Sequence, residues 1–318
     1  MSGRNYAIGV DIGGINIKTG LVEDSGHILY KRVVQARPEE AVKVILQEVM
    51  DLVGEIIKFA EEKGIRFRGI GIGAPGLIDS QEGIIRFLTN FPKWKDVPVG
   101  ELFNKTFNLP IFIENDVRAA ALGEHKFGAG RNKEHLICLA IGTGIGSGII
   151  IDGQLLKGSR QFGGEVGHMT VLPDGPPCAC GNRGCLEMMA SARSVTRRAM
   201  EALSRQEETS LLKVYKEKGA ITPEDVAQEA SQGDLVSRRI YEETGQWLGI
   251  GVASLINIFN PEMVIIGGGV ANAGELLLEP VRREVQDRAM PVLRDSVSIV
   301  LAELREEAGV IGAASMLF

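Results

Sequence analysis

One pattern occurs twice in this 318-residue chain: an apolar strand, a glycine-rich turn and a second apolar strand. The first copy covers residues 8–22 and turns at Gly13-Gly14, and the second covers residues 138–153 and turns around Gly144. Glycine is the outlier in composition, with 40 residues, and such turns let backbone approach another group closely. The duplication predicts two related α/β lobes with a cleft between them.

The remaining pattern places helices around these strands. Apolar residues at helical spacing predict a long helix over 39–63, and Gly64 is well placed to end it. We predict a mixed sheet with helices on its faces. The other predicted strands are 6–12, 17–22, 27–34, 70–73, 111–113, 263–266 and 297–301, and the other predicted helices are 117–127, 239–259, 274–289 and 309–316. The polar stretch 204–235 is typical of surface helices.

Composition excludes several classes of function. An apolar content of 44% is ordinary for a globular protein, and no apolar run approaches the roughly 18–20 residues that span a bilayer. A net charge of −6 gives no electrostatic reason to bind nucleic acid or an anionic membrane. The first residues, Met-Ser-Gly-Arg-Asn-Tyr, lack the pattern of a secretory signal, so we expect a cytoplasmic protein.

The two glycine turns are candidate phosphate sites. In the first, Asp11 ends a strand and can hold Mg²⁺ through its waters, while Lys18 can neutralise phosphate oxygens. The second offers the hydroxyl of Thr143 and the backbone N–H of Gly144. The first turn alone is also compatible with an ordinary Asp-Gly hairpin, and it is not a glycine-lysine P-loop.

A third glycine run, Gly267-Gly268-Gly269, follows a predicted strand and can pass close to an adenine or ribose. The alternative is a tight turn from strand to helix.

A carboxylate at the start of the 117–127 helix is the candidate general base. Asp116 can take the proton from an alcohol that attacks a phosphoryl group, and Asn115 can bind a sugar hydroxyl. The alternative role for Asp116 is to cap the helix. Two turn-rich segments, 74–76 and 89–94, follow predicted strands. In the second, Asn90 can bind a hydroxyl and Trp94 can form the wall of a pocket. Surface loops are the alternative for both.

Three of the four cysteines lie within eight positions, just after a histidine. Together His168, Cys178, Cys180 and Cys185 form the ligand set of a tetrahedral zinc site. A disulfide would leave one cysteine idle. The nearby carboxylates Glu165 and Glu187 are not needed by a structural zinc, so we predict that zinc shapes a loop whose other side chains grip a polar substrate. The fourth cysteine, Cys138, is predicted to lie in the core.

These motifs together resemble the ROK family of bacterial sugar kinases and repressors, over essentially the whole chain. The specific parts are Glu165–His168, Cys178–Glu187 and Asn115-Asp116. The resemblance implies a two-lobed actin-like (ribonuclease H-like) ATPase fold. We place a small domain at 1–116 plus 302–318 and a large domain at 117–301, which contains the zinc loop 168–187.

The resemblance also implies roles for individual residues. Asp116 is the implied base toward a sugar 6-hydroxyl. His168 would serve zinc and sugar with one ring nitrogen each. The implied sugar contacts are Gly76, Asn90, Asn115, Asp116, Glu165, His168 and Glu187, and the implied contacts to ATP and Mg²⁺ are Asp11, Gly13, Gly14, Lys18, Thr143, Gly144, Gly268 and Gly269. One departure stands out, because Ile15 occupies a position where the family usually has threonine.

The implied activity is ATP-dependent phosphorylation of a hexose, with glucose as the expected sugar and a homodimer or homotetramer as the expected assembly. Kinases for N-acetylmannosamine, N-acetylglucosamine, fructose, mannose or allose share this scaffold, and polyphosphate is an alternative donor. A sugar-responsive repressor is a second hypothesis, although only ten residues precede Asp11, which leaves no room for a DNA-binding domain. A sugar-binding or structural zinc protein without catalysis is the third.

Overall fold

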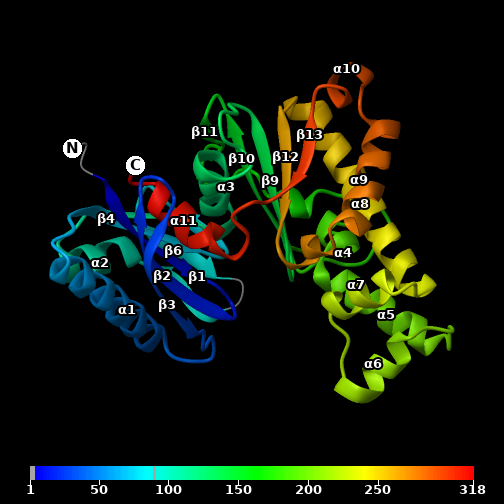
Figure 1. Cartoon of the computed structure of the whole chain (residues 1–318), viewed down its shortest axis with the longest axis horizontal. Coiled ribbons are helices and arrows are strands. Elements are labelled where there is room, and N and C mark those ends of the chain that lie inside the picture. Colours follow the sequence, from blue (N-terminus) through cyan, green and yellow to red (C-terminus); the bar gives the residue numbers. More distant parts are fainter. Residues whose placement is uncertain (1–3, 89–90) are drawn as a thin grey trace. The chain divides into compact units, whose positions relative to one another are not determined.

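The computed structural model describes residues 4–88 and 91–318. Its first sheet has five strands in the order β3–β2–β1–β4–β8 (Figure 1). β1 is antiparallel to β2 and parallel to β4, and β4 is parallel to β8. The bounds are β1 Tyr6–Ile12, β2 Asn16–Glu23, β3 Ile28–Gln35, β4 Phe67–Ala74 and β8 Ile111–Asn115.

The second sheet connects its five strands in the same way, in the order β11–β10–β9–β12–β13. In both sheets the third strand along the chain lies at one edge, followed by the second, first, fourth and fifth. The bounds are β9 Leu136–Ile141, β10 Ile145–Ile151, β11 Gln154–Leu155, β12 Met263–Gly267 and β13 Ser298–Leu301. The predicted duplication of mixed sheets is therefore confirmed.

Helices surround the strands, and none in the described part of the chain combines the length and apolar character needed to cross a membrane. The α-helices are α1 Val42–Glu62, α2 Val99–Phe107, α3 Asp116–Phe127, α4 Leu186–Ala190, α5 Ala192–Ser204, α6 Leu211–Lys218, α7 Pro223–Ser231, α8 Leu235–Phe259, α9 Glu275–Arg288, α10 Pro291–Arg294 and α11 Ala308–Ser315. Short 3-10 helices are η1 Val166–His168, η2 Gly269–Ala273 and η3 Arg305–Glu307.

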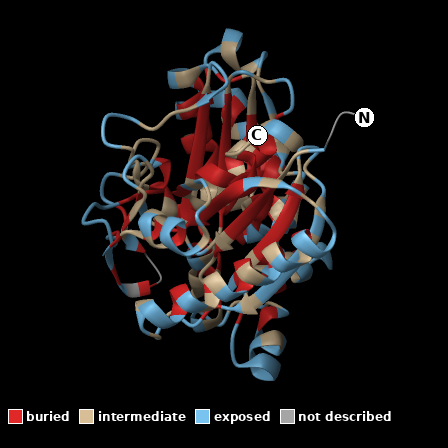
Figure 2. Cartoon of the chain, turned by 90° about the vertical axis from the view of Figure 1, so that its left-hand side faces the viewer, coloured by how far each residue is buried: buried red, intermediate tan, exposed pale blue. Residues whose placement is uncertain are grey.

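The core lies along the strands, which are largely buried, whereas the helices carry much of the exposed surface (Figure 2). In α1 the apolar residues Ile45, Val49, Val53 and Ile56 recur every three or four positions, so that one stripe of the helix is buried in the core beneath the first sheet. The predicted helix over 39–63 is thus present, with its first residues outside the helix.

A small three-stranded sheet, in the order β5–β6–β7, follows β4. Its strands are Leu77–Asp79, Ile84–Leu88 and Phe91–Val97. Residues 91–94 belong to β7, so the surface-loop interpretation of segment 89–94 was wrong for them. Trp94 is fully buried and meets Phe91 edge-on with ring centroids 5.9 Å apart, so it is a core residue rather than a pocket wall.

Helix α11 packs unusually close to β1, β4 and α3. A Cβ built on Gly71 of β4 would lie 1.9 Å from the carbonyl oxygen of Ala313, and one on Gly312 would lie 1.9 Å from that of Ala119 in α3. Only glycine permits such backbone approach. The last helix in the chain therefore completes the packing of the N-terminal strands.

The chain divides into two compact units. Unit 1 comprises residues 1–133, 148–164 and 303–318, and unit 2 comprises 134–147 and 165–302. This division differs from the predicted boundaries because α3 packs on α11, which draws residues 117–133 into unit 1, and because side chains of unit 1 hold segment 148–164.

Candidate active site

In unit 1, three parallel strands bring predicted site residues to one edge of the sheet. Asp11 of β1 is in register with Gly73 of β4, and Ala74 of β4 with Asn115 of β8. Asp116 follows directly as the first residue of α3. Ligands of open α/β sheets bind beyond the carboxyl ends of such strands. Asp11, Asn115 and Asp116 therefore lie at one edge of the first sheet.

Asn115 shapes the start of α3. Its side-chain oxygen accepts hydrogen bonds from the backbone N–H of Val117 (3.0 Å) and Arg118 (3.2 Å), and its Nδ2 donates to the carbonyl of Gly76 (3.2 Å). Asp116 also accepts from Val117 N–H, at 2.8 Å. Asn115 is thus the cap residue, and the same side chain joins the Gly76 turn to the base candidate.

Asp11 lies near two other carboxylates, those of Asp116 and Glu307. Burial raises the pKa of Asp11 from its ordinary value of 3.8 to about 7, and the carboxylates of Asp116 and Glu307 add to the effect while Lys18 opposes it. The ammonium of Lys18 donates to the carbonyl oxygen of Glu306 at 2.8 Å. Carboxylates held close together in this way attract a divalent cation.

Replacing Asp11 by asparagine should raise the melting temperature of the ligand-free protein at pH 8. The folded state keeps Asp11 protonated up to about pH 7, whereas the unfolded chain ionises it near pH 4, so stability falls as pH rises through this window. The full pKa shift corresponds to ~4 kcal/mol. Because the side chain is half-buried, we expect the substitution to raise the free energy of unfolding at pH 8 by less, about 1–3 kcal/mol. Thermal unfolding of both proteins at pH 4.5 and pH 8 measures the change in melting temperature. An equal change at both pH values would show that the raised pKa of Asp11 is not its cause.

In unit 2, the predicted phosphate turn and the predicted sugar residues meet around Ile145. The turn Gly142–Gly144 joins β9 to β10, and the carboxylate of Glu187 accepts from Ile145 N–H at 3.0 Å. A Cβ on Gly144 would lie 2.3 Å from Glu187 Oε2, and one on Gly167 would lie 2.1 Å from the Ile145 carbonyl oxygen. The segment 165–168, Glu187 and the Thr143-Gly144 turn therefore form one cluster.

Gly268 and Gly269 lie at the same edge of the second sheet. They follow β12, whose last residue Gly267 is in register with Ala140 of β9. The structure thus places this glycine run beside the end of β9, from which the Thr143 turn departs.

The four predicted metal ligands come together in unit 2. The ligand atoms of His168, Cys178, Cys180 and Cys185 all lie within 4.8 Å of one another. Cys180 Sγ and Cys185 Sγ are 3.7 Å apart, and Cys178 Sγ is 3.7 Å from His168 Nδ1. With Zn–S bonds of about 2.3 Å, the edge of a tetrahedral site is about 3.8 Å. The arrangement therefore fits a tetrahedral metal, with Nδ1 as the histidine ligand.

The electrostatics of this cluster also favour a cation. Burial, followed by the neighbouring Cys180 and Cys178, raises the pKa of Cys185 to about 12. A backbone hydrogen bond from Asn182 is the main cause that lowers the pKa of the exposed Cys180. Three thiols cannot all ionise at such short range unless a metal ion compensates their charge.

Two other predictions have simple outcomes. Asn90 lies outside the described residues. Cys138 is 4% exposed within β9, so its assignment to the core is confirmed.

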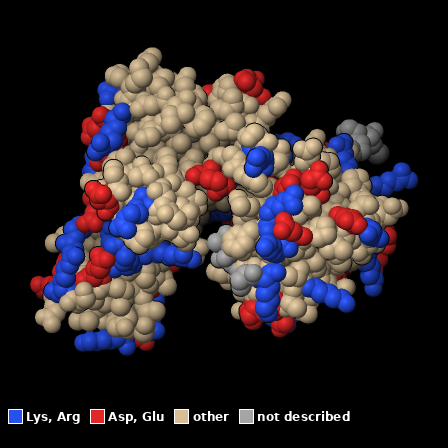
Figure 3. Space-filling view, turned by 180° about the vertical axis from the view of Figure 1, so that it is seen from behind, with Lys and Arg blue, Asp and Glu red and all other residues tan. Residues whose placement is uncertain are grey.

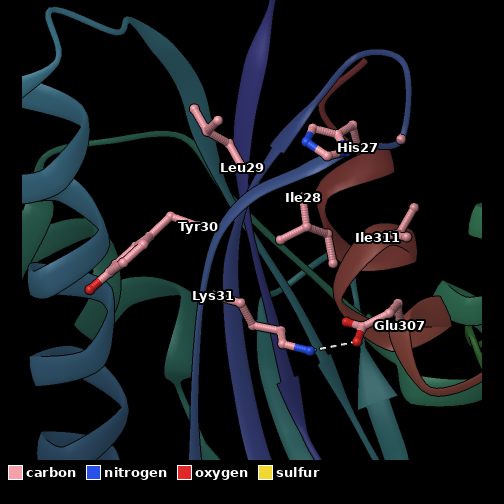
Figure 4. Close-up of a pocket in the computed structure, with 8 residues that line it drawn as sticks. His27, Ile28, Leu29, Tyr30, Lys31, Glu307 and Ile311 are labelled. Atoms are coloured by element: carbon pink, nitrogen blue, oxygen red, sulfur yellow. Dashed lines mark hydrogen bonds and ion pairs between the residues drawn. The ribbon is translucent and has the colours of Figure 1, made fainter.

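A cavity of about 390 Å³ lies between residues 26–31 and the start of α11, where it includes Glu307 and Ile311 (Figure 4). Lys31 points toward Glu307 across it, at 2.5 Å, whereas Tyr30 points to the other side of β3 (Figure 4). None of the predicted site residues lines this cavity.

Sequence reasoning missed several charged residues at the site. Glu306 and Glu307 meet Lys18 and Asp11, but they lie almost 300 positions further along the chain, and no local signal connects them. Glu114 and Arg118 flank Asn115-Asp116 and are both buried. The available signal was the spacing of the two residues. Glu114 comes at the end of an apolar strand and Arg118 at the start of a helix four positions later, a spacing at which opposite charges pair.

The surface carries charged side chains of both signs. Lys and Arg side chains interleave with Asp and Glu side chains over the face shown in Figure 3. The upper left part of that face carries few charged side chains (Figure 3).

Comparison with known proteins agrees with this geometry. The model described as "ROK family" matches residues 7–318. A glucokinase of Thermotoga maritima is 39% identical over 310 residues, covering 98% of this chain and 96% of that protein. A xylose repressor of Caldicellulosiruptor bescii is 36% identical, covering 98% of this chain and 77% of that protein.

Among solved structures, a ROK family glucokinase from Streptomyces griseus in complex with glucose and AMPPNP superposes with a TM-score of 0.85. It is 34% identical, and the match covers 98% of this chain and 99% of that one.

Proposed function

Because this chain belongs to the ROK family, we propose that it is an ATP-dependent kinase that phosphorylates the 6-hydroxyl of a hexose, with glucose as the sugar. The observation that carries the proposal is the edge of the first sheet, where Asp11, Asn115 and Asp116 share the carboxyl ends of parallel strands. The relatives named as glucokinases and the neighbour that binds glucose with a nucleotide analogue support it.

In this proposal Asp116 takes the proton from the sugar hydroxyl as that oxygen bonds to the γ-phosphorus of ATP. The bond between the γ-phosphorus and the bridging oxygen breaks, and ADP leaves. Lys18 and the N–H groups of the Gly13-Gly14 and Thr143-Gly144 turns hold phosphate oxygens, and Asp11 holds the waters of Mg²⁺. When bound, Mg²⁺ neutralises phosphate charge. Gly268 and Gly269 face the nucleoside. Water exclusion favours transfer to sugar over hydrolysis.

The sugar side of the proposal rests on unit 2. Glu165, His168 and Glu187 accept or donate hydrogen bonds to hydroxyls, together with Asn115 and the Gly76 turn of unit 1. A zinc ion on His168 Nδ1 and the three cysteines leaves Nε2 of the ring for the sugar, because one nitrogen then has a fixed partner. Zinc thus fixes the tautomer and the orientation of a sugar contact.

A panel of sugars with Mg-ATP, followed by coupled ADP release, tests the proposal. Glucose should give the highest kcat/KM among glucose, mannose, fructose, allose, N-acetylglucosamine and N-acetylmannosamine. A higher kcat/KM for an acetylated sugar would support a sugar kinase whose substrate is that sugar and not glucose. Polyphosphate in place of ATP tests the donor.

The substitution Ile15→Thr should lower the KM for ATP by about 2- to 10-fold, since a hydroxyl contact is worth roughly 0.5–1.5 kcal/mol. Ile15 is 74% exposed at the tip of the first glycine turn, and its carbonyl accepts a hydrogen bond from Ala36 N–H, so the backbone there does not depend on the side chain. Ile15→Val is the matched control, because valine has the shape of threonine without the hydroxyl. Equal effects of both substitutions would show that the hydroxyl is irrelevant.

Two observations favour a second candidate function, a sugar-responsive protein without catalysis. Ile15 lacks the hydroxyl of the family's usual threonine, and one relative is named as a xylose repressor. Such a protein would bind sugar in calorimetry but release no ADP. For either function we propose a homodimer or homotetramer, which light scattering measures.

A further inference from the structure

A buried ion network in unit 1 links the base-bearing strand–helix junction to the chain that leads into Glu165. Arg118 and Glu114 have side chains only 4% and 1% exposed, and Arg118 Nη1 lies 3.5 Å from Glu114 Oε1. The other carboxylate oxygen of Glu114 is 2.8 Å from Lys157 Nζ, which also donates to Ser80 Oγ at 3.2 Å. Buried charges of this kind are costly unless they hold a defined geometry.

The network holds a loop of the main chain, residues 157–163, which we call the 157–163 ring. The guanidinium of Arg118 donates from Nη1 to the carbonyl of Gln161 and from Nη2 to the carbonyl of Gly163. The N–H of Gly163 donates back to the carbonyl of Lys157 at 2.8 Å, so residues 157–163 form a ring tied at both ends. A planar fork with fixed donor spacing can serve two carbonyls at once, which an ammonium on a flexible stem does not.

The ring ends where the chain crosses from unit 1 into unit 2. Gly164 has a φ of +87°, and Glu165 is the first residue of the next unit-2 segment. Glu165 precedes η1, whose last residue is the metal-ligand candidate His168. Any displacement of the ring moves the point from which Glu165 and His168 depart.

We propose that Arg118, supported by Glu114 and Lys157, is a positioning residue for sugar binding: it fixes the 157–163 ring and thereby sets where Glu165 begins. Arg118 touches neither sugar nor nucleotide in this role. The inference rests on the proposed function, because it takes Glu165 as a sugar contact. The strand–helix junction at Asn115-Asp116 would then have two roles: it places the proposed base, and through Glu114 and Arg118 it holds the 157–163 ring.

Arg118→Met removes both carbonyl contacts, and Arg118→Lys keeps the charge but loses the fork. We expect Arg118→Met to raise the sugar KM by about 10- to 100-fold, because small displacements at a binding site have effects of that size. The KM for ATP should stay within about twofold, and Arg118→Lys should fall between. Arg32→Met is the matched control, since Arg32 is half exposed and pairs with Glu55 on α1.

Hydrogen exchange supplies a readout that does not depend on activity. Amides of residues 157–168 should exchange faster in Arg118→Met, while those of α1 should not change. Lys157→Met tests the same ring through a partly exposed residue and should raise the sugar KM by a smaller factor. An unchanged sugar KM in folded Arg118→Met and Lys157→Met, or faster exchange spread evenly over unit 1, would overturn the inference.

The inference and the proposed function fail differently. A wild-type protein that phosphorylates no sugar refutes the function, whatever the exchange data show. A wild-type kinase whose Arg118 variants keep their sugar KM refutes only the positioning role.

Discussion

Replacing Asp116 by asparagine is expected to lower kcat by about 10³-fold while the Kd for glucose stays within a few-fold. Asparagine has the same shape and still offers an oxygen to Val117 N–H, so the start of α3 is preserved. It cannot accept the proton of the attacking hydroxyl, and the loss therefore falls on the chemical step. A coupled steady-state assay gives kcat, and calorimetry gives the Kd.

Asp51→Asn is the matched control, since Asp51 is an exposed carboxylate on α1 that accepts a hydrogen bond from Gln47. It should leave both quantities unchanged. Near-normal turnover of Asp116→Asn would remove the base from the mechanism, and a loss of sugar binding equal to the loss of kcat would make Asp116 a binding residue instead.

Replacing Cys180 by serine is expected to remove the metal and weaken sugar binding together. Three remaining ligands do not close a tetrahedral site, and metal affinity should fall by at least about 100-fold. His168 then loses the partner that orients its ring, so the sugar KM should rise by about 10-fold or more. Elemental analysis of the purified protein gives the zinc content, and the kinase assay gives the KM.

Cys138→Ala serves as the control for this experiment. Cys138 is also a cysteine of unit 2, but it is buried in β9 and is not part of the metal cluster. It should keep both zinc and sugar affinity. A zinc-free Cys180→Ser protein with an unchanged sugar KM would show that the metal does not organise the binding residues.

Elements whose signal is local were predictable from sequence. The strand over residues 6–12 is present with its predicted bounds, because its continuous apolar run is buried within the first sheet. Strand β7 was missed because Phe91 and Trp94 are both buried although they are three positions apart, and the ladder shifts register at Phe87/Leu88. Such an irregular ladder breaks the period of two by which strands are recognised.

The same distinction holds for the site. The approach of His168 to the three cysteines was predictable because these four residues lie within 18 positions and form a specific ligand set. The surroundings of Asp11 and Lys18 were not, since the segment of Glu306 and Glu307 reaches them only through tertiary packing. Assigning α3 to unit 1 likewise required knowledge of its contact with α11, which rests on backbone approach at Gly312 rather than on any apolar pattern.

The close packing of α11 on β1, β4 and α3 has a consequence for how the protein is made. All of unit 2 leaves the ribosome before α11 does, so unit 2 can mature while the N-terminal strands still lack their covering helix. The backbone faces at Gly9 and Gly71 stay open to water during that interval. A chain that ends after residue 302 should therefore be cut by proteases in its N-terminal strands before it is cut in unit 2.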